Sequence, residues 1–190
     1  MNKKALVIVD VQNDFCPGGA LAVTHGDHII PVVNNLIKRF TALKLPIFAT
    51  RDWHPPDHCS FQSQGGPWPP HCIQGTEGAL FHPELQLPQT AVTINKGTSL
   101  VKDAYSGFEN TSLLQQLQNI SVDEIVVCGL ATDYCVKATV LDGLKARLEV
   151  TVCKDGIQGV NLHLGDDMRA LNDMANAGAN IKISDTLMLQ

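Results

Sequence analysis

Short apolar runs alternate with amphipathic stretches along almost the whole chain. The runs predict strands at residues 5–10, 46–52, 91–96, 124–130, 148–154 and 180–184. They are continuous rather than alternating, as expected of strands with both faces covered. Apolar residues at helical spacing predict helices over 27–43, 107–118, 133–147 and 165–177. Strands separated by helices indicate βαβ units. We therefore predict an α/β fold: a single-domain, three-layer α/β/α arrangement with a mainly parallel, roughly six-stranded, Rossmann-like sheet.

Length and composition limit the classes of protein that remain. The chain has 190 residues, of which 44% are hydrophobic and 17% charged, which suits one globular domain over residues 1–190. The net charge of −5 and the lack of a Lys/Arg cluster argue against nucleic acid as a partner. No apolar stretch is long enough to span a membrane, and the N-terminal run ends at Asp10 without a cleavage site. We expect a cytoplasmic protein with no nucleic-acid or membrane partner.

Cys135 is the cysteine whose position most favours chemistry. None of the six cysteines forms a Cys-x-x-Cys pair, so we expect free thiols in a reducing compartment. Cys128 and Cys153 lie within apolar runs and are expected in the core, whereas Cys135 lies between a predicted strand and a predicted helix. Thr132 is predicted as the N-cap, which places Cys135 in the first helical turn, where the helix dipole favours a thiolate. The alternative is an inert, packed thiol.

Residues 53–90 interrupt the alternation, because they predict neither helix nor strand. Half of the ten prolines lie between Pro55 and Pro70, and both tryptophans, Trp53 and Trp68, lie in the same region. Long loops in compact domains are typically functional or disordered. The aromatic, proline-rich and sparsely charged composition favours an ordered, functional loop.

Four chemically useful residues follow consecutive predicted strands. Asp10 ends the first, Asp52 the second and Lys96 the third, and Cys135 follows the fourth. Ligands bind outside the carboxyl ends of strands in open α/β sheets, and parallel strands would collect these residues at one edge. Each alone could be a turn or surface residue. Together they predict a base, a cation, a metal-type ligand and a nucleophile in one site.

One carboxylate and several imidazoles predict a metal-binding loop region at about 52–90. Asp52 and His54, two apart on an extended chain, point to the same side. His71 follows the proline-rich segment. This donor set suits zinc, iron or manganese. Whether His58 is a further ligand stays open, and the alternative is a set of surface histidines on a polar loop.

These residues stand in segments that resemble the nicotinamidases of the cysteine hydrolase superfamily, which also contains isochorismatases. The resemblance covers nearly the whole chain, in the segments 9–15 (VDVQNDF), 17–21 (PGGAL), 52–55 (DWHP), 58 with 60–61, 68–72 (WPPHC), 95–97 (NKG), 105–108 (YSGF) and 129–136 (GLATDYCV). It implies an isochorismatase-like hydrolase fold. The set of Asp52, His54 and His71, together with the tryptophans, separates nicotinamidases from relatives that lack the metal.

The resemblance also implies a reaction and the residues that perform it. A triad of Asp10, Lys96 and Cys135 would deamidate nicotinamide to nicotinate and ammonia through a cysteine thioester, as in NAD salvage, with pyrazinamide as a further substrate. Asp10 would take the thiol proton, and Lys96 would favour the thiolate. The backbone N–H groups of Ala131 and Cys135 would form the oxyanion hole. The family has a cis peptide at the position of Leu130–Ala131.

A metal site and a ring pocket follow from the same resemblance. One divalent ion per chain, zinc first with iron or manganese as alternatives, would hold the pyridine nitrogen and be bound by Asp52, His54 and His71. The residues expected to wall the ring, each of which could instead be ordinary packing, are Phe15, Leu21, Trp68, Tyr105 and Tyr134.

Two other functions stay open. A related amidase could act on another small amide, which a comparison of kcat/KM across amides would separate. A non-catalytic binding module would be marked by loss of Asp10, Lys96 or Cys135, and all three are present. The expected partner is a small-molecule amide, and the sequence leaves open whether the chain forms a homo-oligomer.

Overall fold

The computed structural model describes residues 3–187 and contains one six-stranded sheet. Its strands are β1 (Lys4–Val9), β2 (Ile47–Asp52), β3 (Val92–Lys96), β4 (Glu124–Leu130), β5 (Glu149–Gln158) and β6 (Asn180–Lys182). They lie in the order β3-β2-β1-β4-β5-β6, and every neighbouring pair is parallel. The predicted α/β class, with its six mainly parallel strands, is confirmed.

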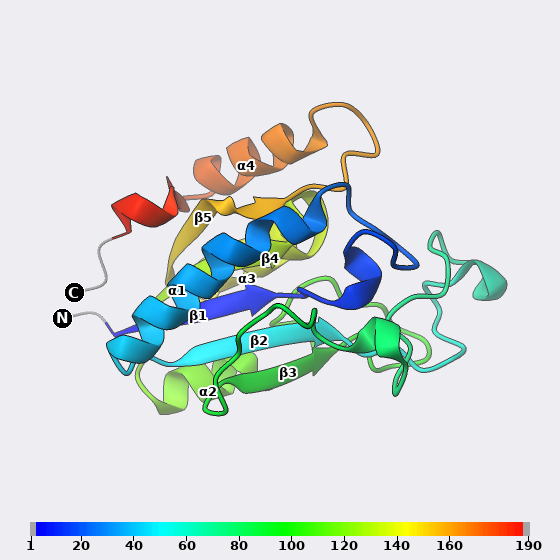
Figure 1. The fold of residues 1–190 in the computed structure, drawn as a ribbon, viewed down its shortest axis with the longest axis horizontal. Coiled ribbons are helices and arrows are strands. Elements are labelled where there is room, and N and C mark those ends of the chain that lie inside the picture. The colour runs from blue at the N-terminus through cyan, green and yellow to red at the C-terminus, as the bar shows by residue number, and fades with distance from the viewer. Residues whose placement is uncertain (1–2, 188–190) are drawn as a thin grey trace.

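Helices cover both faces of this sheet. They are α1 (Ile30–Ala42), α2 (Leu113–Asn119), α3 (Lys137–Lys145) and α4 (Asp166–Asn176). Figure 1 shows α1 across the front of the sheet, with α2 and α3 behind it. Successive side chains of a strand point to opposite faces. Leu6 and Ile8 of β1 accordingly pack in one core cluster with α1, while Val7 packs in the other with α2, α3 and α4.

The central strands of the sheet all end at the same edge, and the functional residues lie there. β1 is buried along Ala5–Val9 and pairs with β2 on one side and β4 on the other. Because the order of strands reverses at β1, the loops after β1 and β4 diverge and leave a crevice at the carboxyl edge. Figure 1 shows the long loop after β2 on this same side of the sheet.

The long loop is as irregular as predicted. Between 53 and 90 the structure has only two short 3-10 turns, Gln62–Gln64 and Glu77–Ala79, and isolated bridges that tie the loop to itself and to Gln12. Phe61 within it is fully buried. The loop is therefore packed against the sheet edge rather than extended into solvent.

Two predictions about the helices were wrong in detail. The helix predicted over 107–118 begins only at Leu113, because the preceding turn is closed by the Thr111 hydroxyl, which donates to Gly107 O. Thr132 is not an N-cap. It begins a π-helical turn, Thr132–Val136, that precedes α3 and is closed by backbone bonds from Tyr134 and Val136 to Ala131 O. Cys135 lies inside that turn.

β5 is longer than predicted, and its register explains why. The β4–β5 pairing shifts between Val127 and Gly129, and beyond the shift β5 continues to Gln158. Gly129 has φ +117°, and an added Cβ would lie 2.0 Å from Val9 O, so only glycine fits there.

No helix among residues 3–187 is long and apolar enough to cross a membrane.

Candidate active site

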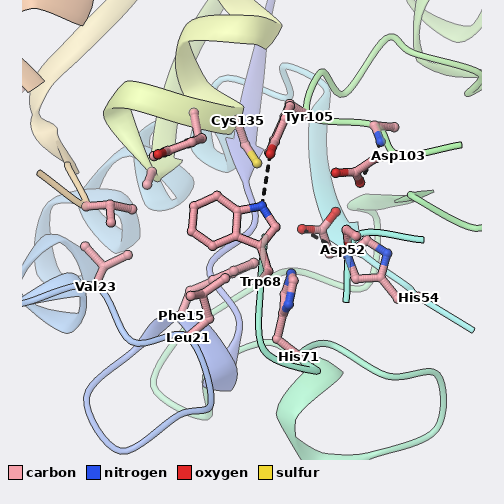
Figure 2. A pocket seen from close by; sticks show the side chains of 15 residues that line it. Phe15, Leu21, Val23, Asp52, His54, Trp68, His71, Asp103, Tyr105 and Cys135 are labelled. Atoms are coloured by element: carbon pink, nitrogen blue, oxygen red, sulfur yellow. Dashed lines mark hydrogen bonds and ion pairs between the residues drawn. The ribbon is translucent and has the colours of Figure 1, made fainter. Parts of the chain in front are cut away.

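The side chains predicted from the strand ends meet around one pocket at the carboxyl edge of the sheet. Figure 2 shows Asp52, His54, His71 and Cys135 pointing into a common space together with the aromatic residues. The pocket is lined by Phe15, Leu21, Val23, Asp52, His54, Ser60, Trp68, His71, Asp103, Ala104, Tyr105, Ala131, Tyr134, Cys135 and Val160. Asp10 and Lys96 lie beneath it, almost completely buried.

Lys96 is the centre of the buried charges. Its Nζ lies 2.9 Å from Asp10 Oδ2 and 2.5 Å from Asp52 Oδ1. The same nitrogen lies 3.4 Å from Cys135 Sγ and 3.2 Å from Ala104 O. One ammonium group therefore contacts the expected base, the expected nucleophile and an expected metal ligand.

Burial and Lys96 act in opposite directions on the two carboxylates. Burial raises the pKa of Asp10, and Lys96 only partly opposes this. Burial would also raise the pKa of Asp52, but Lys96 and His54 outweigh it and lower that pKa. Burial would lower the pKa of Lys96, yet Asp10 and Asp52 raise it well above its ordinary value. Lys96 and Asp52 are thus a charged pair, while Asp10 is the carboxylate more ready to take up a proton.

Burial and Lys96 act in opposite directions on the Cys135 thiol. Burial raises its pKa well above the ordinary value, while Lys96 opposes that rise, which is the direction expected of Lys96 from the sequence. The reactive atoms of Asp10, Asp52 and Cys135 all lie within 4.8 Å of one another. Proton transfer from Cys135 to Asp10 can thus accompany the attack.

Asp10 is held so that one oxygen faces this exchange. Thr50 Oγ1 donates to Asp10 Oδ1 at 2.7 Å. Oδ2 has the Lys96 ion pair but, among the described residues, no aligned hydrogen bond. Asp10 itself has φ 47°, a backbone conformation that non-glycine residues rarely adopt and that is often found at functional sites.

The turn before Cys135 presents backbone donors to the pocket. Ala131 and Cys135 both line it, and the Leu130–Ala131 peptide is cis, as the resemblance implied. Both residues of the predicted oxyanion hole therefore lie at the pocket, and the role of their amides stays a prediction.

Asp52, His54 and His71 form a compact group of metal-type donors. One ligand atom from each lies within 4.8 Å of the others, and all three residues are buried. His54 Nδ1 lies 2.8 Å from Gly97 O, and His71 Nδ1 lies 2.8 Å from Pro69 O. Since a carbonyl can only accept, both rings carry the proton on Nδ1, which leaves the Nε2 lone pairs for a metal. This donor set fits a divalent transition ion.

His58 lies outside that group. Its ring stacks on His54 with centroids 4.0 Å apart, and it forms a second donor group with His54 and Asp103. Its Nδ1 accepts a hydrogen bond from the Ser60 amide at 3.3 Å. Its buried Nε2 lies 4.0 Å from Asp103 Oδ1 but has no hydrogen bond among the described residues. His58 therefore lies beside the group of Asp52, His54 and His71 without being part of it.

The five residues expected to enclose the substrate ring all line the pocket. Trp68 Nε1 donates to Tyr105 Oη at 3.0 Å, and the Trp68 and Tyr134 rings meet edge to face at 5.2 Å. The Phe15 ring lies 5.6 Å from the His71 ring. These aromatic side chains therefore line the same pocket as the metal-type donors and the sulfur.

Sequence reasoning missed several lining residues. They lie in loops that have no periodic pattern, and they are Val23, Ser60, Asp103, Ala104 and Val160. Ser60 and Asp103 stand close in sequence to His58 and Tyr105, and that proximity was the one signal that could have found them. Val23 and Val160 reach the pocket only through the tertiary fold.

Comparison with known proteins agrees with this geometry. The isochorismatase domain family matches residues 4–185. A nicotinamidase of Escherichia coli (strain K12) is 42% identical over 95% of each chain. A pyrazinamidase of Pyrococcus horikoshii, in complex with zinc, is 48% identical with a TM-score of 0.92, over 95% of this chain and 99% of the other. A protein of L. infantum, in complex with nicotinate, is 34% identical with a TM-score of 0.90, over 98% and 96% of the two chains.

Proposed function

This chain belongs to the isochorismatase family, and from that membership and its site we propose that it is a metal-dependent nicotinamidase. It hydrolyses the amide of nicotinamide to nicotinate and ammonia, a step of NAD salvage, and also acts on pyrazinamide. The observation that carries the proposal is the position of Lys96, whose Nζ contacts Asp10, Asp52 and Cys135 beneath an aromatic pocket. The relatives named above support the same substrate class.

The catalytic residues follow from the contacts. Asp10 takes the proton of the Cys135 thiol as the sulfur attacks the amide carbon, and the amides of Ala131 and Cys135 stabilise the oxyanion. Asp10 then gives that proton to the leaving nitrogen, which departs as ammonia. Water hydrolyses the thioester, releases nicotinate and regenerates the thiol. Lys96 keeps the buried charges paired throughout.

Asp52, His54 and His71, in the loop region at about 52–90, would hold one divalent ion, for which zinc is the first choice. There the ion would supply Lewis-acid binding of the substrate's ring nitrogen and so orient the ring. Phe15, Leu21, Trp68, Tyr105 and Tyr134 enclose the ring on its apolar faces.

An ammonia-release assay tests the function directly. Metal-replete protein should release ammonia from nicotinamide and pyrazinamide, and kcat/KM for nicotinamide should exceed that for aliphatic amides, because aromatic side chains line the pocket. A higher kcat/KM for another small amide would favour the related-amidase alternative. No release from any amide of the panel would exclude both, and would leave the binding module.

Removal of the metal is expected to weaken substrate binding before it affects anything else. Protein purified without chelator should contain about one divalent ion per chain by elemental analysis, since Asp52, His54 and His71 together offer donors for one ion. After dialysis against a chelator, KM for nicotinamide should rise by at least about tenfold, and added zinc should restore it. A chelated protein with unchanged KM and no residual metal would contradict this role.

The hydrogen bond between Trp68 and Tyr105 is expected to set ring binding. Tyr105→Phe removes the acceptor of the Trp68 indole N–H but keeps the ring, at a cost of about 1 kcal/mol. We therefore expect KM to rise about fivefold with kcat nearly unchanged. Steady-state kinetics measure this. A fall in kcat with unchanged KM would instead place the Tyr105 hydroxyl in the chemical step.

We also propose a cytoplasmic location, supported by six cysteines that are all free thiols. A small-molecule amide is the partner that the nicotinate complex of the L. infantum relative supports.

A further inference from the structure

The segment after β1 contains polar side chains to which the proposed reaction assigns no role. Gln12, Asn13 and Asp14 begin two residues after Asp10; Gln12 is the N-cap of a short 3-10 turn that contains Asn13 and Asp14. We propose that Gln12 and Asp14, which we call the brace, are positioning residues that hold the metal ligands Asp52 and His71. This inference rests on the metal site of the proposed function.

Gln12 completes the hydrogen bonding of Asp52 at the point where the pairing of β1 with β2 stops. The last backbone bond between the two segments runs from the Asp10 amide to Thr50 O at 3.2 Å, after which the chain turns away. Gln12 Nε2 donates to Asp52 O at 2.8 Å, and Gln12 Oε1 accepts from the Asp52 amide at 2.8 Å. Buried backbone groups need partners, so this side chain takes the place of a strand residue.

The amide of Gln12 is used completely. Its second N–H donates to Ala79 O at 3.0 Å, and the residue is 0% exposed, so water cannot replace these bonds. Asp52 meanwhile contacts Lys96 through Oδ1 and faces His54 through Oδ2. A shift of the Asp52 backbone would therefore displace both the metal ligand and the partner of Lys96.

Asp14 holds the other side of the metal site. Its Oδ2 accepts from the Cys72 amide at 2.7 Å, and its Oδ1 accepts from the Ala20 amide at 3.1 Å. Cys72 directly follows His71 and has φ 46°, so the chain after this ligand is held in an uncommon conformation. An added Cβ at Gly78 would lie 2.2 Å from Asp14 Oδ2, which shows how closely the loop encloses the carboxylate.

The two parts of the brace act on different neighbours, which makes the proposal specific. Neither side chain is among the pocket-lining residues of the described chain. Gln12 acts through Asp52, which also pairs with Lys96, so its loss should weaken metal binding and lower kcat. Asp14 acts through the chain beside His71, so its loss should weaken metal binding and raise KM with little change in kcat.

Three variants test this in the full-length protein. Gln12→Met keeps the side-chain length but none of its hydrogen bonds, and Asp14→Asn keeps the shape but can accept from only one of the two amides. Asn13→Leu is the matched control. It removes a side-chain amide of the same turn. That amide donates to Glu77 O at 2.8 Å, and not to Asp52 or to the chain beside His71.

Three quantities are measured for each variant. They are the zinc affinity of the metal-free protein, determined by competition with a chromophoric chelator; the thermal unfolding of the metal-free protein; and the steady-state kinetics after zinc is added back. We expect Gln12→Met and Asp14→Asn to bind zinc about 10–100-fold more weakly than wild type, as outer partners of metal ligands typically do. The zinc affinity of Asn13→Leu should stay within about twofold of wild type, because the Asn13 amide donates to Glu77 O and not to the chain at a metal ligand.

The proposal is overturned if both brace variants fold and bind zinc as wild type does, or if Asn13→Leu weakens binding equally. Failure of the metal-free Asp14→Asn protein to fold also overturns it, since the role would then be structural. If Gln12→Met alone does not fold, Asp14→Asn decides. Wild-type protein that binds no zinc would contradict the proposed function itself, which separates the two failures.

Discussion

Replacement of Cys135 by alanine should reduce ammonia release from nicotinamide by a factor on the order of 10⁴ or more, because no other group can form the thioester. Cys135 Sγ is the only sulfur among the pocket-lining residues of the described chain. Initial rates of ammonia release, with wild type beside the variant, measure the effect. Substrate binding should persist, since the ring-holding residues and the metal ligands are untouched.

A second cysteine variant controls for loss of any thiol. Cys59 is half-buried, lies outside the pocket lining, and Cys59→Ala should keep wild-type kinetics. Mass spectrometry of wild type quenched in acid during turnover should also show an acyl adduct on Cys135. Activity within tenfold of wild type in a folded Cys135→Ala protein would refute the assignment of the nucleophile.

Lys96→Met should both abolish activity and destabilise the fold. The variant leaves Asp10 and Asp52 buried without their shared cation, and loss of one partner of a buried ion pair typically costs about 3–5 kcal/mol. Urea unfolding at neutral pH measures this. Lys102→Met is the control, because Lys102 pairs with Glu109 at the surface at 3.5 Å and should contribute at most about 1 kcal/mol.

The pH dependence of Lys96→Met gives a further check on the same variant. In wild type, the folded-state pKa of Asp52 is lowered, so this group contributes stability above its unfolded pKa, and that contribution is lost as pH falls. Without Lys96, burial would raise the folded-state pKa of both carboxyls above their unfolded values. The stability deficit of the variant should therefore shrink as pH falls from 8 to about 5. A deficit that grows over this range would show that the carboxylates are paired by something else.

The protonation of Cys135 depends on its burial as well as on its neighbours in sequence. The sequence predicted that a helix start and Lys96 both favour a thiolate at Cys135. In the structure Cys135 lines the pocket but is almost completely buried, and burial raises the pKa of its thiol while Lys96 opposes that rise. Asp10, whose Oδ2 pairs with Lys96 but has no hydrogen bond among the described residues, is the carboxylate that can accept the thiol proton.

The sequence by itself determined the sheet and the residues at its edge. Continuous apolar runs predict strands buried on both faces, and parallel strands necessarily bring their carboxyl ends together, so Asp10, Asp52, Lys96 and Cys135 could be grouped before any coordinates. Asp52 and the imidazoles of the proline-rich loop predicted the metal ligands, whereas the ring pocket was implied by the resemblance to nicotinamidases. Local pattern was sufficient for these features because each depends on the order of elements along the chain.

Only the tertiary structure decided how those residues are held. Three contacts join segments that are far apart in sequence. Gln12 hydrogen-bonds to the Asp52 backbone, Asp14 accepts from the chain beside His71, and Val160 lines the pocket. Thr132 could not be placed correctly either, because the turn before α3 is closed by backbone groups of a π-helical turn rather than by a side-chain cap. Such contacts and the desolvation of Cys135 depend on packing in three dimensions, and no periodicity in the chain encodes them.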